Sequence, residues 1–267
     1  MYVNNILIHV TKDEAKQALG TVVVTHGIAE HSGRYEKMAN TLNQQGFHCI
    51  RYDLRGHGQS AGPRGKLKSF KNFIEDLHEV VKEAKKYQLP VFLLGHSLGG
   101  LITHMYAVTY QDVDGIITSG APTDFLKDVM PLRIFGPRLL GWFSTKTNFA
   151  DDQLSRIPSS ERAYINDPLN LKKMYGSLIG ETMVKGVRYL KKNIDKHDVP
   201  TFIMHGGHDT IVPYAMSEKM YKLIKHPDKT ITIYKDAYHE IFYDLDQDVC
   251  YEDVVTWLKK TLKKTQT

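Results

Sequence analysis

The chain has 267 residues, of which 42% are hydrophobic and 24% are charged. This composition excludes an intrinsically disordered protein and suits one α/β domain with a modest insertion, or two small domains. The formal net charge of +5 comes without a dense basic stripe or a recognisable module, which argues against a nucleic-acid-binding protein.

The first residues, Met1 to Asn5, contain no basic region followed by an apolar run, so we expect no signal peptide. No segment has 18 consecutive apolar residues, so we expect no membrane span. Cys49 and Cys250 lie too far apart in the sequence to indicate a disulfide framework. Together these features predict a cytoplasmic protein, and the mild positive charge is compatible with loose attraction to an anionic membrane surface.

Short β-rich runs alternate with longer helical patterns, beginning with Ile6–Val10, which we expect to add an edge strand. Runs rich in Val, Ile, Thr and Phe predict further strands at Thr21–Gly27, Phe47–Asp53, Val91–Ser97, Gly115–Gly120, Thr201–Gly207 and Thr230–Asp236. Helical patterns cover Arg34–Gln45, Ser69–Tyr87, Gly99–Tyr110, Tyr214–Ile224 and Asp248–Lys263. This alternation predicts a mostly parallel sheet with helices on both faces.

The alternation stops between residues 122 and 185, where prolines are frequent and no strand pattern occurs. We interpret residues 122–185 as a helical cap inserted over the carboxyl edge of the sheet, between core segments 1–121 and 186–267. The alternative is a long irregular surface loop, which is uncommon in a compact domain. The stretch Val129–Phe143 is rich in large apolar groups. It either forms an acyl entrance that touches lipid surfaces or merely packs onto the core.

The segment Gly95-His96-Ser97-Leu98-Gly99 matches the G-x-S-x-G pattern of a serine nucleophile, in the strand–turn–helix context that this pattern requires. Its glycines leave room for a sharp turn, because a side chain at either position would collide with neighbouring backbone. The N-terminal N–H groups of the following helix would face the developing oxyanion. We predict that Ser97 is the nucleophile; the alternative is a glycine-rich turn with an inert serine.

Serine needs an adjacent base, and in this context the order along the chain is serine, acid, histidine. His239 comes just after the last strand run and is the predicted base. Asp209 ends the preceding strand, where its carboxylate would fix the tautomer of the imidazole. Asp124, which follows an earlier strand, is the rival acid.

A metal site is an alternative interpretation of the same cluster. His205, His208 and Asp209 have side chains that can bind a metal, and another histidine would complete the shell. A single H-x-x-H-D run is weak evidence, so we expect no metal.

The oxyanion of an acyl-transfer intermediate needs two backbone N–H groups. The residue after the nucleophile, Leu98, supplies one of them in this arrangement. Ile28, in the loop after the strand Thr21–Gly27, is the candidate for the second.

Several motifs, in order, resemble those of monoacylglycerol lipases and related lysophospholipases. Residues 26–35 (HGIAEHSGRY) are similar to the signature H-G-x-x-E-H-S-x-R-Y, and residues 53–60 (DLRGHGQS) to the turn D-x-R-G-H-G-x-S. Similar segments follow at 95–100, 208–209 and 228–239, so the resemblance spans nearly the whole chain. The group that these motifs resemble is a set of serine hydrolases similar to serine aminopeptidase S33.

This resemblance implies an α/β-hydrolase fold: a mostly parallel central sheet flanked by helices, with a helical cap inserted after the sixth strand. It places Glu30 and Arg34 near the polar end of the substrate, together with Tyr164; the alternative for Glu30 and Arg34 is a structural salt bridge. The chain departs from the mammalian-type members at Phe242, where they have a second histidine. Recognition of the glycerol end therefore does not follow from the resemblance.

The expected function is hydrolysis of a carboxylic ester, most simply a monoacylglycerol, through an acyl-enzyme. No metal or organic cofactor is needed, the expected partner is a small lipid ester, and the cap is the candidate for peripheral membrane contact. A lysophospholipase, a thioesterase or a short- to medium-chain carboxylesterase would use the same triad. A non-catalytic ligand-binding protein on the same scaffold is the alternative from another class. The oligomeric state is not predicted.

Overall fold

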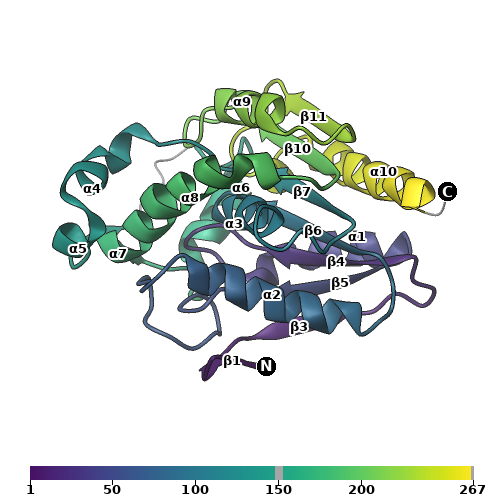
Figure 1. Ribbon diagram of the computed structural model, residues 1–267, viewed down its shortest axis with the longest axis horizontal. Coiled ribbons are helices and arrows are strands. Elements are labelled where there is room, and N and C mark those ends of the chain that lie inside the picture. Colours follow the sequence, from purple (N-terminus) through teal and green to yellow (C-terminus); the bar gives the residue numbers. More distant parts are fainter. Residues whose placement is uncertain (148–152, 266–267) are drawn as a thin grey trace.

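Seven strands form the central sheet of the computed structural model, which describes residues 1–147 and 153–265 (Figure 1). The strand order is β11-β10-β7-β6-β4-β5-β3, and all neighbours are parallel except β3 and β5. The bounds are β3 Val10–Asp13, β4 Gly20–Thr25, β5 Phe47–Tyr52, β6 Val91–His96, β7 Gly115–Ser119, β10 Thr201–Gly206 and β11 Lys229–Tyr234. The predicted, mostly parallel sheet is confirmed.

Helices cover both faces of this sheet, and apolar side chains form a separate core on each side. Every residue of β4 and β6 is buried, as expected for strands that are covered on both faces. One face carries α1 (Glu36–Gln44) and α10 (Gln247–Thr265), and the other carries α2 (Lys71–Lys85), α3 (Leu98–Ala107), α8 (Val187–Asn193) and α9 (Ala215–Leu223). The five helices predicted from the sequence are all present, with ends shifted by a few residues.

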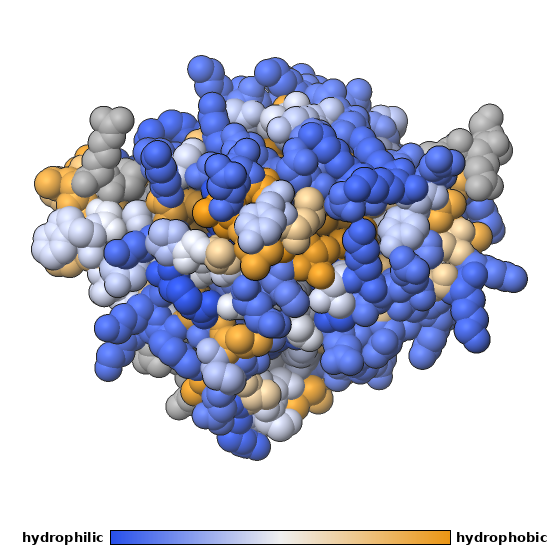
Figure 2. Space-filling model, turned by 90° about the horizontal axis from the view of Figure 1, so that it is seen from below, coloured by the Kyte–Doolittle hydropathy of each residue, from blue (hydrophilic) through white to orange (hydrophobic). Residues whose placement is uncertain are grey.

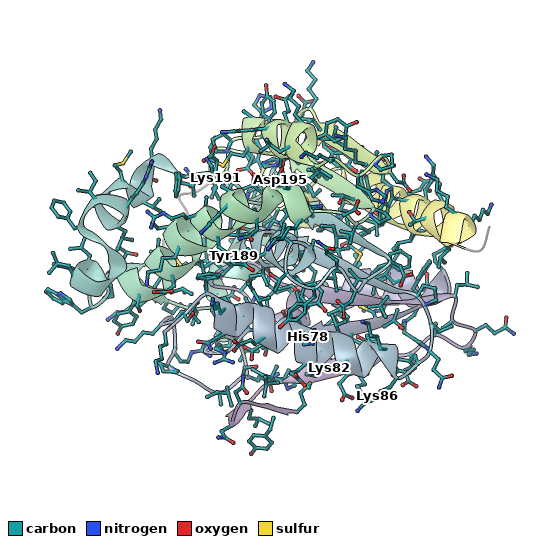
Figure 3. The ribbon with its side chains drawn as sticks, viewed as in Figure 1. His78, Lys82, Lys86, Tyr189, Lys191 and Asp195 are labelled. Carbon is teal, nitrogen blue, oxygen red and sulfur yellow. The ribbon has the colours of Figure 1, made fainter. Side chains whose placement is uncertain are left out.

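The helices α2, α3 and α8 pack together on one face through aromatic side chains. The ring of His78 on α2 stacks on Tyr110, just after α3, with centroids 3.8 Å apart. Tyr189 on α8 lies 5.2 Å from Phe70, at the start of α2. Figure 3 labels His78 and Lys82 on α2 with Lys86 just after it, and Tyr189 and Lys191 on α8 with Asp195 in the short 3₁₀ helix that follows.

The N-terminal edge of the sheet differs from the prediction. Residues Ile6–Leu7 (β2) pair with Tyr2–Val3 (β1) in a separate hairpin, and the edge strand begins only at Val10 and runs antiparallel to β5. Asn4 and Asn5 form the turn with φ values of 48° and 63°, a conformation that asparagine tolerates and that tight two-residue hairpins need. The prediction of one edge strand at Ile6–Val10 was therefore wrong.

The segment between β7 and β10 is mainly helical, and α4, α5 and α7 lie beyond one end of the sheet (Figure 1). Besides α8, its helical elements are η2 Lys127–Val129, α4 Met130–Phe135, α5 Pro137–Leu140, α6 Pro158–Asn166, α7 Gly176–Ile179, the π-helical η3 Gly180–Gly186 and η4 Ile194–Lys196. It also contains a small two-stranded antiparallel sheet of β8 (Ser144–Lys146) and β9 (Lys173–Tyr175), strands too short to give a sequence pattern.

The helical segment follows β7, the seventh strand along the chain, and not the sixth as expected. Within the central sheet β7 is the fifth strand along the chain, because β1 and β2 form a separate hairpin. A helical run of α7, η3, α8 and η4 (Ile194–Lys196) passes through residue 185; the division of the chain into core and cap at that residue stays a prediction.

Large apolar side chains are exposed on α4, α5 and the turn that follows. Exposed fractions here reach 67% for Ile134 and 70% for Trp142, and the other members are Met130, Phe135, Leu139 and Phe143. In Figure 2 some hydrophobic residues are visible at this left-hand end of the molecule, beside residues of intermediate hydropathy, while a larger hydrophobic area lies near the centre of the face. Among the described residues, no helix is long and apolar enough to cross a membrane.

Candidate active site

Ser97 lies on a strained turn between β6 and α3. Its backbone angles, φ 52° and ψ −118°, are rare for a residue with a side chain. A Cβ atom at Gly95 would lie 2.3 Å from the carbonyl oxygen of Gly99, and one at Gly99 would lie 2.0 Å from the carbonyl oxygen of Thr25. Both positions therefore require glycine, as the motif predicted.

Three side chains that are distant in the sequence meet where β6, β10 and β11 end. Ser97 Oγ lies 3.0 Å from Nε2 of His239, and Nδ1 of His239 lies 2.6 Å from Oδ2 of Asp209. All three residues are buried. In this geometry His239 can accept the hydroxyl proton of Ser97 while Asp209 holds the Nδ1–H tautomer.

Asp209 is held by further hydrogen bonds. Its Oδ1 accepts from the backbone N–H groups of Ile211 (2.9 Å) and Val212 (2.8 Å), and its Oδ2 lies 3.0 Å from Nε2 of His205. That Nε2 also lies 2.9 Å from the carbonyl oxygen of Val212. Since a carbonyl can only accept, Nε2 of His205 carries hydrogen, and its Nδ1 is hydrogen-bonded to the hydroxyl of Ser217 at 2.6 Å.

The electrostatics of the Asp209–His239 pair favour an ionised acid beside a basic imidazole. Burial alone would raise the pKa of Asp209, but the neighbouring His239 and His205 outweigh it and hold that pKa well below its usual range. Burial alone would lower the pKa of His239, but the carboxylate of Asp209 outweighs it and raises that pKa above 6.5. The pair is therefore suited to take a proton from a hydroxyl.

The rival acid, Asp124, is engaged elsewhere. Its two carboxylate oxygens pair with the ammonium groups of Lys191 and Lys219, while His239 is hydrogen-bonded to Asp209. The structure therefore favours Asp209 over Asp124 as the partner of the imidazole.

The metal alternative does not fit the geometry. His205 and Asp209 are hydrogen-bonded to each other, but the Nδ1 atom of the exposed His208 lies 2.9 Å from the carbonyl oxygen of Lys235. Among the residues that the structure describes, no group of three or more His, Cys, Asp or Glu side chains converges as metal ligands would.

The two candidate oxyanion donors flank the nucleophile. Leu98 is the first residue of α3, so its N–H belongs to the first turn, whose N–H groups lack intrahelical acceptors. Ile28 lines the same pocket as Ser97. It follows Gly27, where an added Cβ would lie 3.2 Å from Cβ of Ser97. This arrangement is compatible with the predicted oxyanion hole, and the roles of the two N–H groups stay predictions.

A cavity of about 330 Å³ opens onto Ser97 and His239. Its walls come from the sheet edge and from the inserted segment. The side chains from the inserted segment are mostly apolar: Leu126, Val129, Leu154, Met174, Ile179 and Met183. Such a lining suits an apolar group placed beside the nucleophile.

Glu30 and Arg34, the residues that the resemblance places near the substrate, belong to a buried ion-pair network. Arg34 Nη1 donates to Oε2 of Glu30 at 2.6 Å, and its two terminal nitrogens donate to both carboxylate oxygens of Glu240 at 2.6 and 2.8 Å. Glu30 Oε1 also accepts from the N–H of Gly27 at 2.6 Å. Glu30 and Glu240 line the cavity, whereas Arg34 lies behind them and holds both.

Tyr164 joins this network through its ring. The guanidinium carbon of Arg34 lies 4.7 Å from the ring centroid of Tyr164 and 4.3 Å from that of Tyr243, and Tyr164 lines the cavity. The sequence interpretation missed Glu240 and gave His205 only as a metal ligand. The position of Glu240 directly after His239 was the available signal, whereas nothing in the sequence pattern pointed to His205 as a partner of Asp209.

Comparison with known proteins gives relatives that cover nearly the whole chain. The profile of the family described as serine aminopeptidase, S33, matches residues 16–246. A monoacylglycerol lipase of Mycolicibacterium smegmatis is 29% identical over 90% of this chain and 88% of its own length. The phospholipase YtpA of Bacillus subtilis is 26% identical over 88% of this chain and 93% of its own length. The crystal structure of a monoacylglycerol lipase from Paleococcus ferrophilus superposes with a TM-score of 0.86 and 31% identity, covering 95% of this chain and 99% of that one.

Proposed function

The chain belongs to the serine aminopeptidase S33 family of α/β-hydrolases, and on this premise we propose that it hydrolyses monoacylglycerols to a fatty acid and glycerol. It is a serine ester hydrolase. The observation that carries the proposal is the chain of contacts from Ser97 through His239 to Asp209 beside an apolar cavity. The relatives named as monoacylglycerol lipases support the choice of substrate.

In the proposed reaction, His239 Nε2 takes the proton of Ser97 as Oγ bonds to the carbonyl carbon of the ester. The N–H groups of Ile28 and Leu98 stabilise the resulting oxyanion, and each such donor is typically worth about 3–4 kcal/mol of barrier. The C–O bond to glycerol then breaks, and the leaving oxygen takes the proton from His239. Water attacks the acyl-enzyme by the same route, which releases the fatty acid and restores Ser97.

The cavity supports a substrate with a single acyl chain. Its volume of about 330 Å³ lies near the lower end of the range for small-molecule pockets, about 300–1,000 Å³. The apolar lining would hold the acyl chain, and Glu30, Glu240 and Tyr164 would lie at the polar end. The roles of these residues belong to the proposal.

Residues 122–185 form the proposed cap, and its exposed apolar group, Met130 to Phe143, is the proposed contact with lipid surfaces. Apolar side chains grouped on one exposed surface mark an interaction site more often than scattered ones do. A Phe135→Ser/Trp142→Ser double variant is expected to lose flotation with anionic liposomes. The matched control is Leu245→Ser, which changes an exposed leucine outside the cap. Unchanged flotation of the double variant would refute the lipid contact.

The test of the function is turnover of a monoacylglycerol by the wild type and by Ser97→Ala. The wild type should release fatty acid, and the folded variant should not. Ser159→Ala, at an exposed serine on α6, is the matched control and should keep its activity. Wild-type turnover in Ser97→Ala would overturn the assignment, and absence of turnover in the wild type would exclude the substrate.

A lysophospholipase is the second candidate, because the relative from Bacillus subtilis is named a phospholipase. The two functions differ in the leaving group and not in the triad. A panel of esters with one acyl chain and different leaving groups therefore separates them.

A further inference from the structure

Three carboxylates line the cavity beside Ser97: Glu30, Asp128 and Glu240. No lysine or arginine is among the described residues that line it. Besides these acids, the ionisable side chains that line the cavity are those of His96, His239 and Tyr164.

The guanidinium of Arg34, behind the cavity wall, does not neutralise both Glu30 and Glu240. Arg34 is shared between Glu30 and Glu240, so two carboxylates face one guanidinium and a net negative charge remains. Burial alone would raise the pKa of Glu30, but Arg34 outweighs it and keeps that carboxyl ionised. Asp128, which is exposed, is a third carboxylate among the residues that line the cavity.

We propose that this excess of negative charge makes the cavity select its leaving group by charge. A neutral polyol is accepted and a phosphate monoester is rejected. The hydroxyls of a polyol donate hydrogen bonds to carboxylate oxygens, whereas a phosphate brings only acceptors and like charge into a largely buried site, where charges are poorly screened. Selection of this kind rests on a repulsive element as much as on an attractive one.

This inference rests on the proposed function and assigns to the cavity carboxylates the choice between neutral and anionic esters. The molecule as a whole predicts the opposite order, because its net charge of +5 attracts anionic substrates. Rejection of an anionic ester would therefore have to come from the cavity, and the experiment separates the two effects.

The experiment compares kcat/KM for 1-octanoylglycerol with that for 1-octanoylglycerol 3-phosphate, both kept monomeric below their aggregation concentrations. The neutral ester is expected to be preferred at least about tenfold, a difference of about 1.4 kcal/mol. Equal rates, or a preference for the phosphate ester, would overturn the inference while leaving ester hydrolysis intact. Absence of activity on both esters would instead overturn the proposed function.

Substitution of the acids then locates the effect. Glu240→Gln removes one negative charge and is expected to reduce the ratio of the two kcat/KM values, neutral ester over phosphate ester, several-fold. Glu252→Gln makes the same change at an exposed position on α10 and should leave the preference unchanged. Asp128→Asn, also exposed, keeps the inference testable where Glu240→Gln does not fold, and it should narrow the preference in the same direction. A preference that persists unchanged in the folded acid variants would overturn the role of these carboxylates.

Discussion

Replacement of Asp209 by asparagine tests the role of the acid in the proposed catalytic arrangement. Oδ1 of Asp209 accepts two backbone N–H groups, and Oδ2 accepts from His239 at 2.6 Å and lies 3.0 Å from His205. An asparagine can keep its oxygen on the two backbone donors only by turning its amide NH₂ toward the two imidazoles. Nδ1 of His239 must then accept, so Nε2 carries the proton and cannot take one from Ser97.

The expected loss follows from this change of tautomer. A triad whose acid becomes an amide typically loses about 10⁴-fold in kcat, which corresponds to about 5 kcal/mol of barrier. Asp209 also raises the pKa of His239 against the effect of burial, so residual activity in Asp209→Asn should begin at lower pH than in the wild type.

The assay is steady-state hydrolysis of a soluble monoacylglycerol across a pH series, with the fold of each variant checked by circular dichroism. Asp124→Asn is the matched control, because Asp124 pairs with surface lysines; it should keep activity within about threefold of wild type, as a surface substitution usually does. A folded Asp209→Asn with more than about a tenth of wild-type activity would refute the reasoning, as would a larger loss in Asp124→Asn.

Three further predictions concern the same arrangement. The kcat/KM of the wild type should rise with pH through a midpoint above the usual histidine pKa, because His239, the proposed base, must be neutral to act and Asp209 raises its pKa against the effect of burial; a pH titration of initial rates checks this, and a midpoint at or below the usual histidine value would contradict it. His205→Phe should lower kcat about tenfold and cost about 1–3 kcal/mol in urea unfolding, because Asp209 loses a donor and the buried hydroxyl of Ser217 loses its partner; unchanged kcat and stability would rule out this positioning role. Gly99→Ala should lower the free energy of unfolding by about 1–3 kcal/mol, because the added Cβ would lie 2.0 Å from the carbonyl oxygen of Thr25; thermal unfolding checks this, and a wild-type Tm would contradict the close approach.

The sequence was sufficient to predict the parallel sheet and the motif residues, because both depend on local pattern. Strand runs of Val and Ile marked the core strands, and the glycines around Ser97 marked the turn. The positive φ of Ser97 agrees with the sharp turn that the motif predicted.

What the sequence did not predict depends on contacts between distant segments or on very short elements. The Asn4–Asn5 hairpin and the strand Ser144–Lys146 involve too few residues for a periodic pattern. The pairing of Arg34 with Glu240 joins residues 206 positions apart, and no spacing rule connects them. The contact of His205 with Asp209 depends on how the chain turns after β10, which the motif does not specify.

Mass-spectrometric mapping of a fluorophosphonate adduct tests most directly whether the hydroxyl at position 97 is activated. The account predicts a single adduct on the peptide that contains Ser97, and its loss when His239 is replaced by alanine. An adduct on another residue, or none on a folded and active protein, would contradict it.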